Sequence, residues 1–420
     1  MGFDMKEMIK KNWEKLSYIL AIVGPGLITV NAGNDAGGIS TFATIGAKYG
    51  YSMLWGLLLL TFALAIVQEM NARMAVVTGK GLSDLIREKF GVKWTFFAMT
   101  VLFIANFGVT LGDFAGVAAS LELFGITKYL SVPIVALLIS YLVSHGSYNK
   151  VEKIFLMFSF AFFSYIISAI IIKPDWPVVL KSIVTPTIEM NSAYLLTFIG
   201  LIGTTISPYM QFYLQAAIVD KNLSLKDYKY ERLDVYLGAV WGAIISFFVI
   251  VVTAATLHKA GIEANSVSSI ALALKPLAGE YAFILFGAGL FGASVLACAI
   301  IPLSTAYAIC EAFGWENGVN NTPSEAKAFF TLLFGIIGIT ASLVLIPNLN
   351  LIPLILRTQQ IAGVLVPVIL IFMILLINDR NIMGSMVNNR FQNIISTLTV
   401  LFIISLTTTL FVTQIMSLFS

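Results

Sequence analysis

One carboxylate lies inside an apolar stretch of this chain that is long enough to cross a bilayer. Asp35 is flanked by three glycines, at positions 33, 37 and 38, in a segment that runs from about residue 18 to residue 45. Glycine-rich backbone predicts that the helix opens there, and open backbone survives at membrane depth only where protein or a water-filled cavity satisfies it. An acid at this depth is a functional site by default, so the segment predicts half of an ion site. A structural role, in which Asp35 only pairs with a buried Lys or Arg, stays open as the alternative.

A second segment carries the same kind of irregularity near the middle of the chain. It reads Gly203-Thr204-Thr205-Ile206-Ser207-Pro208-Tyr209-Met210-Gln211. A proline inside a helix removes a backbone donor and clashes with the carbonyl four residues back, so it kinks or breaks the helix. An ordinary proline kink would be tolerated in a membrane helix. However, paired interrupted helices at matching positions of two repeats are the best sequence indication of a transporter's midplane site.

The ends of two such broken helices supply groups for an ion. The first half of each would end in unpaired carbonyls with partial negative charge, which favour a cation. The carbonyls of Ala32 and Thr204 are the candidates, because each lies three residues before the key side chain of its segment, Asp35 or Ser207. The opposing half-helix N-termini favour an anion, so a zwitterionic substrate such as an amino acid also fits.

The composition of the whole chain indicates a membrane setting for these two segments. Of 420 residues, 58% are hydrophobic and 11% are charged, whereas about a quarter of the residues in soluble domains are charged. This excludes a set of water-soluble domains and predicts an all-α polytopic membrane protein. Cys298 and Cys310 have no Cys-x-x-Cys spacing and no paired His, so we expect both to pack as small apolar residues.

Eleven apolar runs are long enough to be transmembrane helices. With the two interrupted segments, they predict an inverted repeat of five plus five helices in which helices 1 and 6 are broken, an architecture that resembles the LeuT type. We expect a cytoplasmic N-terminal segment at 1–18, a first repeat at 19–190, a second repeat at 191–378, and helix 11 with the C-terminus at 379–420. The expected spans are about 19–47, 53–77, 95–121, 131–146, 154–173, 192–218, 235–258, 281–311, 327–346, 351–377 and 393–417.

Positive residues fall unevenly on the segments between these spans. With the N-terminus inside, Lys and Arg of the inner segments outnumber those of the outer segments about threefold, which predicts a cytoplasmic N-terminus and an outer C-terminus. The inner loop 78–93 is expected to form a short amphipathic helix, with Ser83 as its candidate cap.

Several flanking motifs accompany the two irregular segments. They include Gly24-Pro25, Gly46-Ala47-Lys48-Tyr49-Gly50-Tyr51, Ala72-Arg73, Val77-Thr78-Gly79-Lys80 and Asp379-Arg380-Asn381-Ile382-Met383-Gly384. With Asp35-Ala36-Gly37-Gly38 and Ser207-Pro208-Tyr209, they make most of the chain resemble the Nramp family of divalent-metal transporters. That family has Asp-Pro-Gly-Asn in its first helix and Met-Pro-His in its sixth.

The resemblance implies a metal site built from the aspartate, the asparagine, the methionine and carbonyls of both broken helices. The aspartate is kept as Asp35, whereas the asparagine position is Gly38 and the methionine position is Ser207. Thioether sulfur selects soft metals, while carboxylate, carbonyl and water suit Mg²⁺, Ca²⁺ and Mn²⁺. Loss of the sulfur and a wider cavity would suit Mg²⁺, which dehydrates reluctantly and keeps several waters. The pattern is similar to the Nramp-related magnesium transporters, a branch that carries Mg²⁺ and Mn²⁺.

The proton route that the resemblance implies is altered. Classical members have a histidine after the proline of helix 6 and two acids on helix 3, and here these positions are Tyr209, Thr110 and Asp113. Tyrosine does not titrate near neutral pH, so uncoupled, gradient-driven uptake is the favoured mechanism. Two roles for Asp113 are equally open: it belongs to a residual proton route, or it is a buried acid whose hydrogen bonds are satisfied.

Other polar residues near the two breaks are weaker candidates. Gln359 matches a family glutamine, and Gln359 and Gln360 would contact the water shell of the ion or gate the cavity. Such amides equally often only bond between helices. Comparable supporting candidates are Asn34, Thr205, Tyr209 and Gln211.

From the residues and the resemblance we expect a transporter, not an enzyme, that imports Mg²⁺ and accepts Mn²⁺ across the plasma membrane of a prokaryote by alternating access. The ion is the substrate, no cofactor is implied, and the expected partners are the ion and the lipid bilayer, with no nucleic acid. Monomer and dimer both remain open. The alternatives are a proton-coupled Mn²⁺/Fe²⁺ transporter, a sodium-coupled amino-acid or other organic-solute carrier, and, last, a membrane-embedded enzyme.

Overall fold

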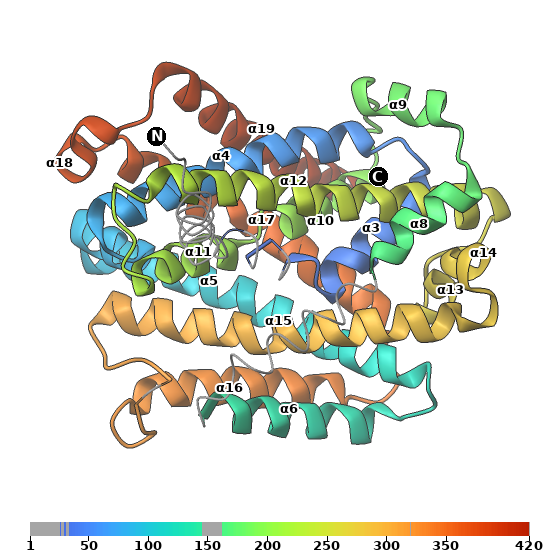
Figure 1. Cartoon of the computed structure of the whole chain (residues 1–420), viewed down its shortest axis with the longest axis horizontal. Helices are drawn as coiled ribbons and strands as arrows, with labels where there is room; N and C mark the ends of the chain where they lie inside the picture. Colours follow the sequence, from blue (N-terminus) through green and yellow to red (C-terminus); the bar gives the residue numbers. More distant parts are fainter. Residues whose placement is uncertain (1–25, 27–28, 31–32, 145–161, 320, 420) are drawn as a thin grey trace, which may run out of the picture.

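The computed structural model describes residues 26, 29–30, 33–144, 162–319 and 321–419, and these residues are almost entirely helical. In Figure 1 most of the long helices lie side by side along the longest axis of the molecule, with their connections at its two ends. The expected all-α architecture is therefore confirmed. The N-terminal segment 1–18 lies outside the described residues.

Most of the long helices follow the expected spans, and four short α-helices of the described residues lie between those spans. In chain order they are α3 (Ala36–Tyr49), α4 (Leu54–Thr78), α5 (Leu82–Glu122), α6 (Lys128–Ser144), α8 (Phe163–Ile172), α9 (Trp176–Val184), α10 (Ser192–Thr205), α11 (Pro208–Asp220), α12 (Tyr228–Thr253), α13 (Val267–Ala271), α14 (Lys275–Ala278), α15 (Ala282–Phe313), α16 (Lys327–Val344), α17 (Leu351–Ile377), α18 (Arg380–Met383) and α19 (Arg390–Phe419). Within the described ranges, eight helices are long and apolar enough to cross a membrane, and α6 and α8 are shorter apolar helices. The number eleven is thus not confirmed, and the repeat boundary near residue 190 stays a prediction.

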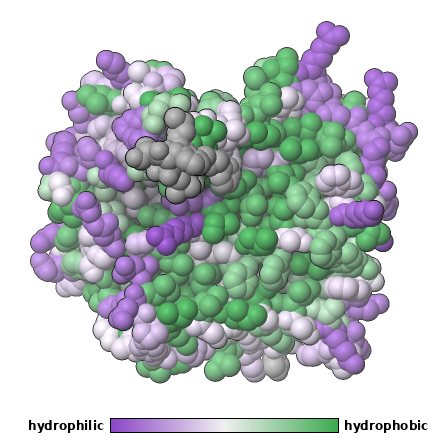
Figure 2. Space-filling model, turned by 180° about the vertical axis from the view of Figure 1, so that it is seen from behind, coloured by the Kyte–Doolittle hydropathy of each residue, from purple (hydrophilic) through white to green (hydrophobic). Residues whose placement is uncertain are grey.

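The outer surface of the bundle is suited to lipid. Figure 2 shows hydrophobic residues over the middle of one face and hydrophilic residues gathered toward its two ends. Large apolar side chains such as Leu137, Ile170 and Phe96 are more than half exposed. An exposed apolar surface of this extent marks an interaction site, and for helices of this length the partner is the bilayer.

The expected amphipathic helix after α4 exists, but its start differs from the prediction. Residues from Leu82 onward join α5 across a bend at Gly91, whose φ of 72° is outside the helical region. The residue at the N-cap is Gly81, and the Ser83 hydroxyl instead donates to Glu311 Oε2 at 2.9 Å. Ser83 as the cap was therefore wrong, because a partner on α15 takes its hydroxyl.

The second predicted break is present between α10 and α11. α10 ends at Thr205, Ile206 leaves the helix, and α11 starts at Pro208, whose missing N–H costs nothing at the first position of a helix. The Ser207 hydroxyl donates to the Gly203 carbonyl at 2.5 Å. This bond satisfies one of the carbonyls that the end of α10 leaves without a helical partner.

Two glycines let α10 and α17 approach backbone to backbone beside this break. A Cβ on Gly203 would lie 2.1 Å from the Gln359 carbonyl oxygen, and a Cβ on Gly363 would lie 2.1 Å from the Ile199 carbonyl oxygen. No side chain larger than hydrogen fits at either place. The broken segment is therefore fixed against α17 at the level of Gln359.

A buried polar network joins helices near the end of the bundle where α12 starts. The Arg73 guanidinium on α4 pairs with Glu69 at 3.1 Å and donates to the Met386 carbonyl at 3.0 Å, and Tyr228 of α12 donates to Glu69. At the same end the Gly26 amide donates to Asp234 Oδ2 at 2.7 Å. Because a buried ion pair is tolerated when further hydrogen bonds satisfy it, this network fixes α4, α12 and the segment before α19 together.

Candidate functional site

Asp35 stands at the break in the first segment, as predicted. Residues Asn34 and Asp35 leave the helical conformation and α3 starts at Ala36, so Asp35 is the N-cap residue. Its Oδ1 accepts from the Gly38 amide at 2.6 Å, and its side chain is buried. The positive end of the α3 dipole holds the carboxylate in place.

Three oxygen atoms lie close to the point that a side chain on Gly38 would occupy. A Cβ built there would lie 2.6 Å from the Gly33 carbonyl oxygen, 3.0 Å from Thr204 Oγ1 and 3.5 Å from Asp35 Oδ1. The Thr204 hydroxyl is buried and has no hydrogen-bond partner among the described residues. We call this group of oxygens from Gly33, Thr204 and Asp35 the oxygen cradle. Carboxylate, carbonyl and hydroxyl oxygens are the ligands that hard cations prefer.

The cradle differs from the expected site in three respects. Thr204 contributes its hydroxyl oxygen, whereas its carbonyl was expected. Ala32 lies outside the described residues, and in the part that is described the carbonyl facing Gly38 belongs to Gly33. The wider space expected at Gly38 is not present, because the Gly33 carbonyl occupies it. Glycine at this position allows close approach of an oxygen rather than a larger void.

A second carboxylate reaches the start of α3 from α5. Asp113 is fully buried, its Oδ1 accepts from the Ala36 amide at 3.3 Å, and its Oδ2 has no partner among the described residues. Thr110, one turn earlier, donates its hydroxyl to the Asn106 carbonyl at 2.8 Å. None of the ion pairs formed within the described ranges includes Asp35 or Asp113. The alternative in which Asp35 pairs with a Lys or Arg therefore finds no support.

Of the two candidate glutamines, one reaches α3. A Cβ on Gly37 would lie 1.6 Å from Gln359 Nε2, and neither polar atom of this buried amide has a partner in the described part of the chain. Gln360 is half-buried, and its Cγ lies 3.5 Å from the Cβ position of Gly200 on α10. Gln359 thus faces the first turn of α3, and Gln360 packs against another helix.

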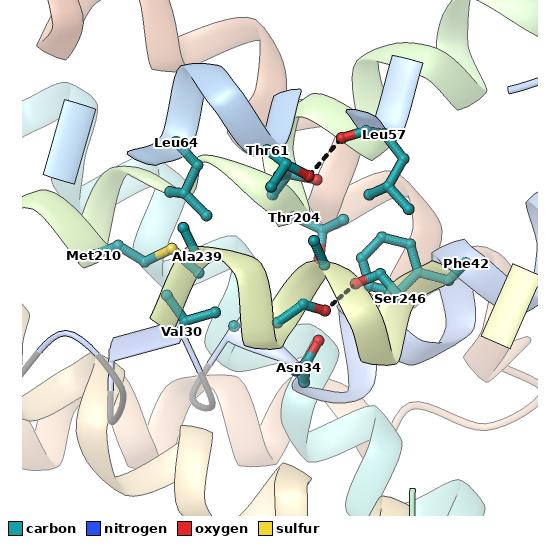
Figure 3. Close-up of a pocket in the computed structure, with 14 residues that line it drawn as sticks. Val30, Asn34, Phe42, Leu57, Thr61, Leu64, Thr204, Met210, Ala239 and Ser246 are labelled. Carbon is teal, nitrogen blue, oxygen red and sulfur yellow. Dashed lines mark hydrogen bonds between the residues drawn. The ribbon is translucent and has the colours of Figure 1, made fainter. Parts of the chain in front are cut away.

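The other candidates divide into support for the break and lining of a cavity. Gln211 accepts from Asn71 Nδ2 at 2.6 Å and donates to the Ser207 carbonyl at 3.3 Å, so it ties α4 to the break. The Thr205 hydroxyl donates to the Leu201 carbonyl at 2.7 Å. Asn34 and Thr205 line a cavity of about 20 Å³ beside the cradle, shown in Figure 3.

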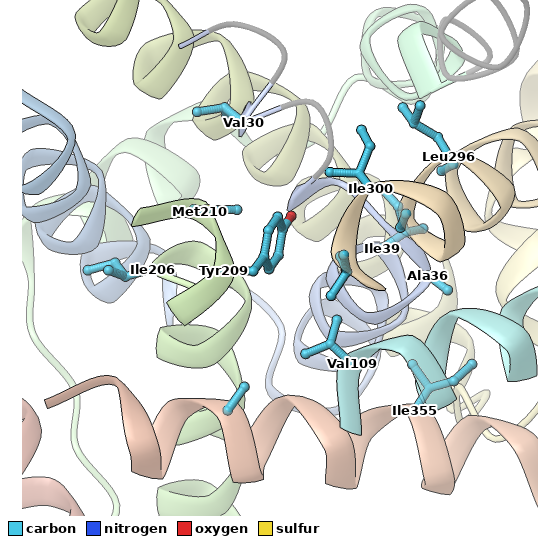
Figure 4. Close-up of a cluster of buried hydrophobic side chains, with 14 of the residues drawn as sticks. Val30, Ala36, Ile39, Val109, Ile206, Tyr209, Met210, Leu296, Ile300 and Ile355 are labelled. Carbon is cyan, nitrogen blue, oxygen red and sulfur yellow. The ribbon is translucent and has the colours of Figure 1, made fainter. Parts of the chain in front are cut away.

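Tyr209 is fully buried, and its hydroxyl has no partner within the described ranges. Figure 4 shows its ring between Met210 and Ile300, close to the start of α3.

No group of three or more His, Cys, Asp or Glu side chains that could hold a metal occurs among the described residues. Cys298 and Cys310 are free and buried, as expected.

Met210 lines the same cavity and was not singled out from the sequence. A Cβ on Gly33 would lie 2.0 Å from Met210 Cε and 3.7 Å from Met210 Sδ. No local signal marked it, because Ser207 is the extended N-cap residue outside α11 and the contact of Met210 with Gly33 depends on tertiary packing. A thioether is therefore still present next to the cradle, although Ser207 stands at the family's methionine position.

Comparisons with known proteins show which proteins the chain and its fold resemble. A divalent metal cation transporter MntH of Deinococcus radiodurans is 24% identical over 403 residues, which cover 92% of this chain and 88% of that protein. The protein of the same name from Bacillus subtilis is 24% identical over 401 residues, covering 92% and 91%. The structure is similar to that of an Eremococcus coleocola manganese transporter, with a TM-score of 0.76, 19% identity, and coverage of 93% and 86%. MhsT in complex with L-phenylalanine has a TM-score of 0.54 at 16% identity, covering 90% and 97%, which shows the shared LeuT-like fold. The model of the family described as Nramp, natural resistance-associated macrophage protein-like, matches residues 26–413, and the chain belongs to that family.

Proposed function

We propose that this protein transports divalent metal cations, with Mg²⁺ as the main substrate and Mn²⁺ also accepted, across the plasma membrane by alternating access. The observation that carries the proposal is the oxygen cradle at Gly38, where Gly33, Thr204 and Asp35 present a carbonyl, a hydroxyl and a carboxylate. Such donors suit Mg²⁺ and Mn²⁺. The curated relatives named as divalent metal cation transporters support the substrate class.

Charge also favours a divalent ion. Asp35 and Asp113 both contact the first turn of α3 and have no Lys or Arg partner in the described part of the chain. Two buried carboxylates are costly unless a cation neutralises them. One divalent ion supplies that charge. The polar side-chain atoms of Thr204 and Gln359 have no hydrogen-bond partner among the described residues and would bond to the waters that the ion keeps. Mg²⁺ gives up these waters reluctantly.

A polar cavity at one end of the bundle offers an entry route. Its volume is about 560 Å³, and it lies where α5, α13 and α17 meet. Ala119 of α5 and Ile352 of α17 line it, each about two helical turns from Asp113 and Gln359 respectively. The distribution of Lys and Arg puts this end outside, with the N-terminus cytoplasmic. We propose that the ion passes from this cavity between α5 and α17 to the start of α3.

Transport without proton coupling is the second part of the proposal. The position next to Pro208 is Tyr209, and tyrosine does not titrate near neutral pH. His258 follows α12 and lies 2.9 Å, through Nδ1, from the Ala47 carbonyl near the far end of α3. No histidine of the described residues therefore takes part in the site at Asp35.

A proton-coupled Mn²⁺ transporter is the second candidate. The thioether of Met210 beside Gly33 favours it, because sulfur prefers softer ions. The name of the Eremococcus structure, a manganese transporter, points the same way. For the sodium-coupled organic-solute carrier, the likeness to MhsT shows the fold alone, and the described residues give it no further support.

Uptake into liposomes tests the proposal. Purified protein is reconstituted, and entry of Mg²⁺, Mn²⁺ and Ca²⁺ is followed together with internal pH. We expect Mg²⁺ and Mn²⁺ to enter and compete with each other without acidification. Asp35→Asn should abolish uptake, whereas Asp175→Asn, which alters another N-cap aspartate at the exposed start of α9, should not. Strong Mn²⁺ preference with proton influx would support the second candidate, and absence of divalent uptake would refute both.

A further inference from the structure

The side chain of Met210 fits into a hole made by Gly33. The Met210 Cε atom lies 2.0 Å from the position that a Cβ on Gly33 would take, so the methyl group occupies the space of the missing side chain. Gly33 belongs to the first broken segment and Met210 to α11, the second half of the other. The contact therefore joins the two interrupted segments directly beside the cradle.

Met210 also lines a small cavity beside Asn34, the residue that precedes Asp35 in the chain. It lines the cavity of about 20 Å³ together with Asn34, Thr204 and Thr205. Figure 3 shows the thioether reaching in between Val30 and Ala239. A cavity of that volume holds about one water molecule. A Mg²⁺ ion that keeps several waters does not fit there while Met210 is in this position.

We propose that Met210 is a movable plug which closes the hydrated part of the ion site and turns aside when an ion with its waters binds. The inference rests on the proposed function and adds the residue that controls access and selectivity by size. Methionine suits this task because it is unbranched and has three rotatable side-chain bonds, so it changes position at low cost. Glycine at 33 receives the methyl group in the closed position.

The competing explanation is that Met210 only fills the core. Buried methionines commonly do so, and Met373 of α17 is an example, fully buried about four turns from Gln359. The two explanations differ in what happens when the hole is filled. An alanine at 33 would put a methyl group where Met210 Cε now lies, and the thioether would have to leave the hole.

A double-mutant cycle of Gly33→Ala and Met210→Ala tests the plug. Gly33 has a helical backbone conformation, which alanine also adopts. We expect Met210→Ala to lower the Mg²⁺ KM severalfold. Gly33→Ala alone should force the thioether into the space for the ion and lower Mg²⁺ uptake about tenfold. In the double variant Gly33→Ala/Met210→Ala, Mg²⁺ uptake should recover to within about threefold of that of Met210→Ala. Met373→Ala serves as the matched truncation and should leave the Mg²⁺ KM unchanged.

Each outcome decides between the explanations. Additive effects of the two substitutions would overturn the plug. If Met210→Ala abolishes Cd²⁺ uptake and leaves the Mg²⁺ KM unchanged, Met210 acts as a sulfur ligand and the plug is likewise overturned. Melting temperatures of all four proteins, measured with and without Mg²⁺, separate folding from binding, since a bound ion raises the melting temperature. Failure of the wild type to take up any divalent ion would instead refute the proposed function.

Discussion

Asp113 Oδ1 lies 3.3 Å from the backbone nitrogen of Ala36, the first residue of α3. The acid thus touches the same helix start that Asp35 caps, although it comes from α5, about eighty residues later in the chain. This relationship brings both carboxylates to the start of α3. Under the proposed function both face one ion, and Asp113 then has a role that differs from the proton route that the family resemblance suggests.

The first prediction concerns the charge of Asp113. In Asp113→Asn the amide oxygen can still accept from Ala36, so the helix start is kept and one negative charge is lost. We expect the Mg²⁺ KM to rise about tenfold, which corresponds to about 1.4 kcal/mol of binding free energy. Uptake into liposomes with internal magnesium and pH dyes measures this effect. Thr110→Val, which alters the other acid position of the family, should stay near wild type. If the wild type takes up protons and Asp113→Asn stops them, Asp113 belongs to a proton route instead.

The second prediction concerns sulfur at position 207. Ser207→Met would place a thioether at the start of α11, and it would also remove the hydroxyl that donates to the Gly203 carbonyl. Because thioether sulfur favours softer ions, we expect the preference for Cd²⁺ and Mn²⁺ over Mg²⁺ to rise about tenfold in competition assays. Ser207→Ala removes the same hydrogen bond without adding sulfur and should not shift the preference. An unchanged preference in Ser207→Met would count against the ligand argument.

Much of the fold follows from the sequence. The apolar runs locate the long helices α4, α15, α16, α17 and α19 within a few residues, because burial in lipid requires long uncharged segments. Pro208 and the glycines around Asp35 locate both breaks, because their backbone chemistry is local. The prediction that Ser83 caps the helix was wrong for a non-local reason, because its hydroxyl bonds to Glu311, which lies more than two hundred residues away in the chain.

The content of the site follows from the sequence only in part. Asp35 lies at the interruption before α3, as expected, whereas Thr204 brings its hydroxyl close to Gly38 where its carbonyl was expected. Two contacts depend on how α3, α10 and α11 pack together. The Gly33 carbonyl approaches Gly38, and the Met210 methyl group approaches Gly33. Contacts of this kind are tertiary and have no local pattern. For that reason the serine at position 207, where the family has methionine, does not indicate that Met210 brings a thioether close to the same place.

The third prediction concerns pH and the ion pair between Lys89 and Asp379, outside the membrane spans. The bond from the Lys89 ammonium and the amide of Asn381 hold the pKa of Asp379 below its ordinary value. A carboxyl group whose pKa is lower in the folded than in the unfolded protein stabilises the fold. This stabilisation is complete above the unfolded-state pKa of about 3.9, and it is lost as the pH falls through the folded-state pKa. Wild type should therefore melt at a higher temperature than Asp379→Asn at pH 7, and the difference should shrink as the pH falls below the unfolded-state pKa. Lys89→Met should behave like Asp379→Asn, and a difference that does not change with pH would exclude the charge as its cause.

The fourth prediction concerns the backbone contact between α10 and α17. A methyl group on Gly203 would lie 2.1 Å from the Gln359 carbonyl oxygen, so Gly203→Ala must push the two helices apart. Forcing extra atoms into a packed core costs about 1–3 kcal/mol, and we expect a clearly lower melting temperature in detergent together with reduced uptake, because Thr204 and Gln359 both move. Gly335→Ala on α16 is the matched control, since a Cβ there meets nothing within 4 Å. Alanine is the better helix former by about 0.5–1 kcal/mol, so that variant should melt at the wild-type temperature or above. Equal melting temperatures for both variants would show that α10 can shift without cost, and the close approach would then not fix the position of the break.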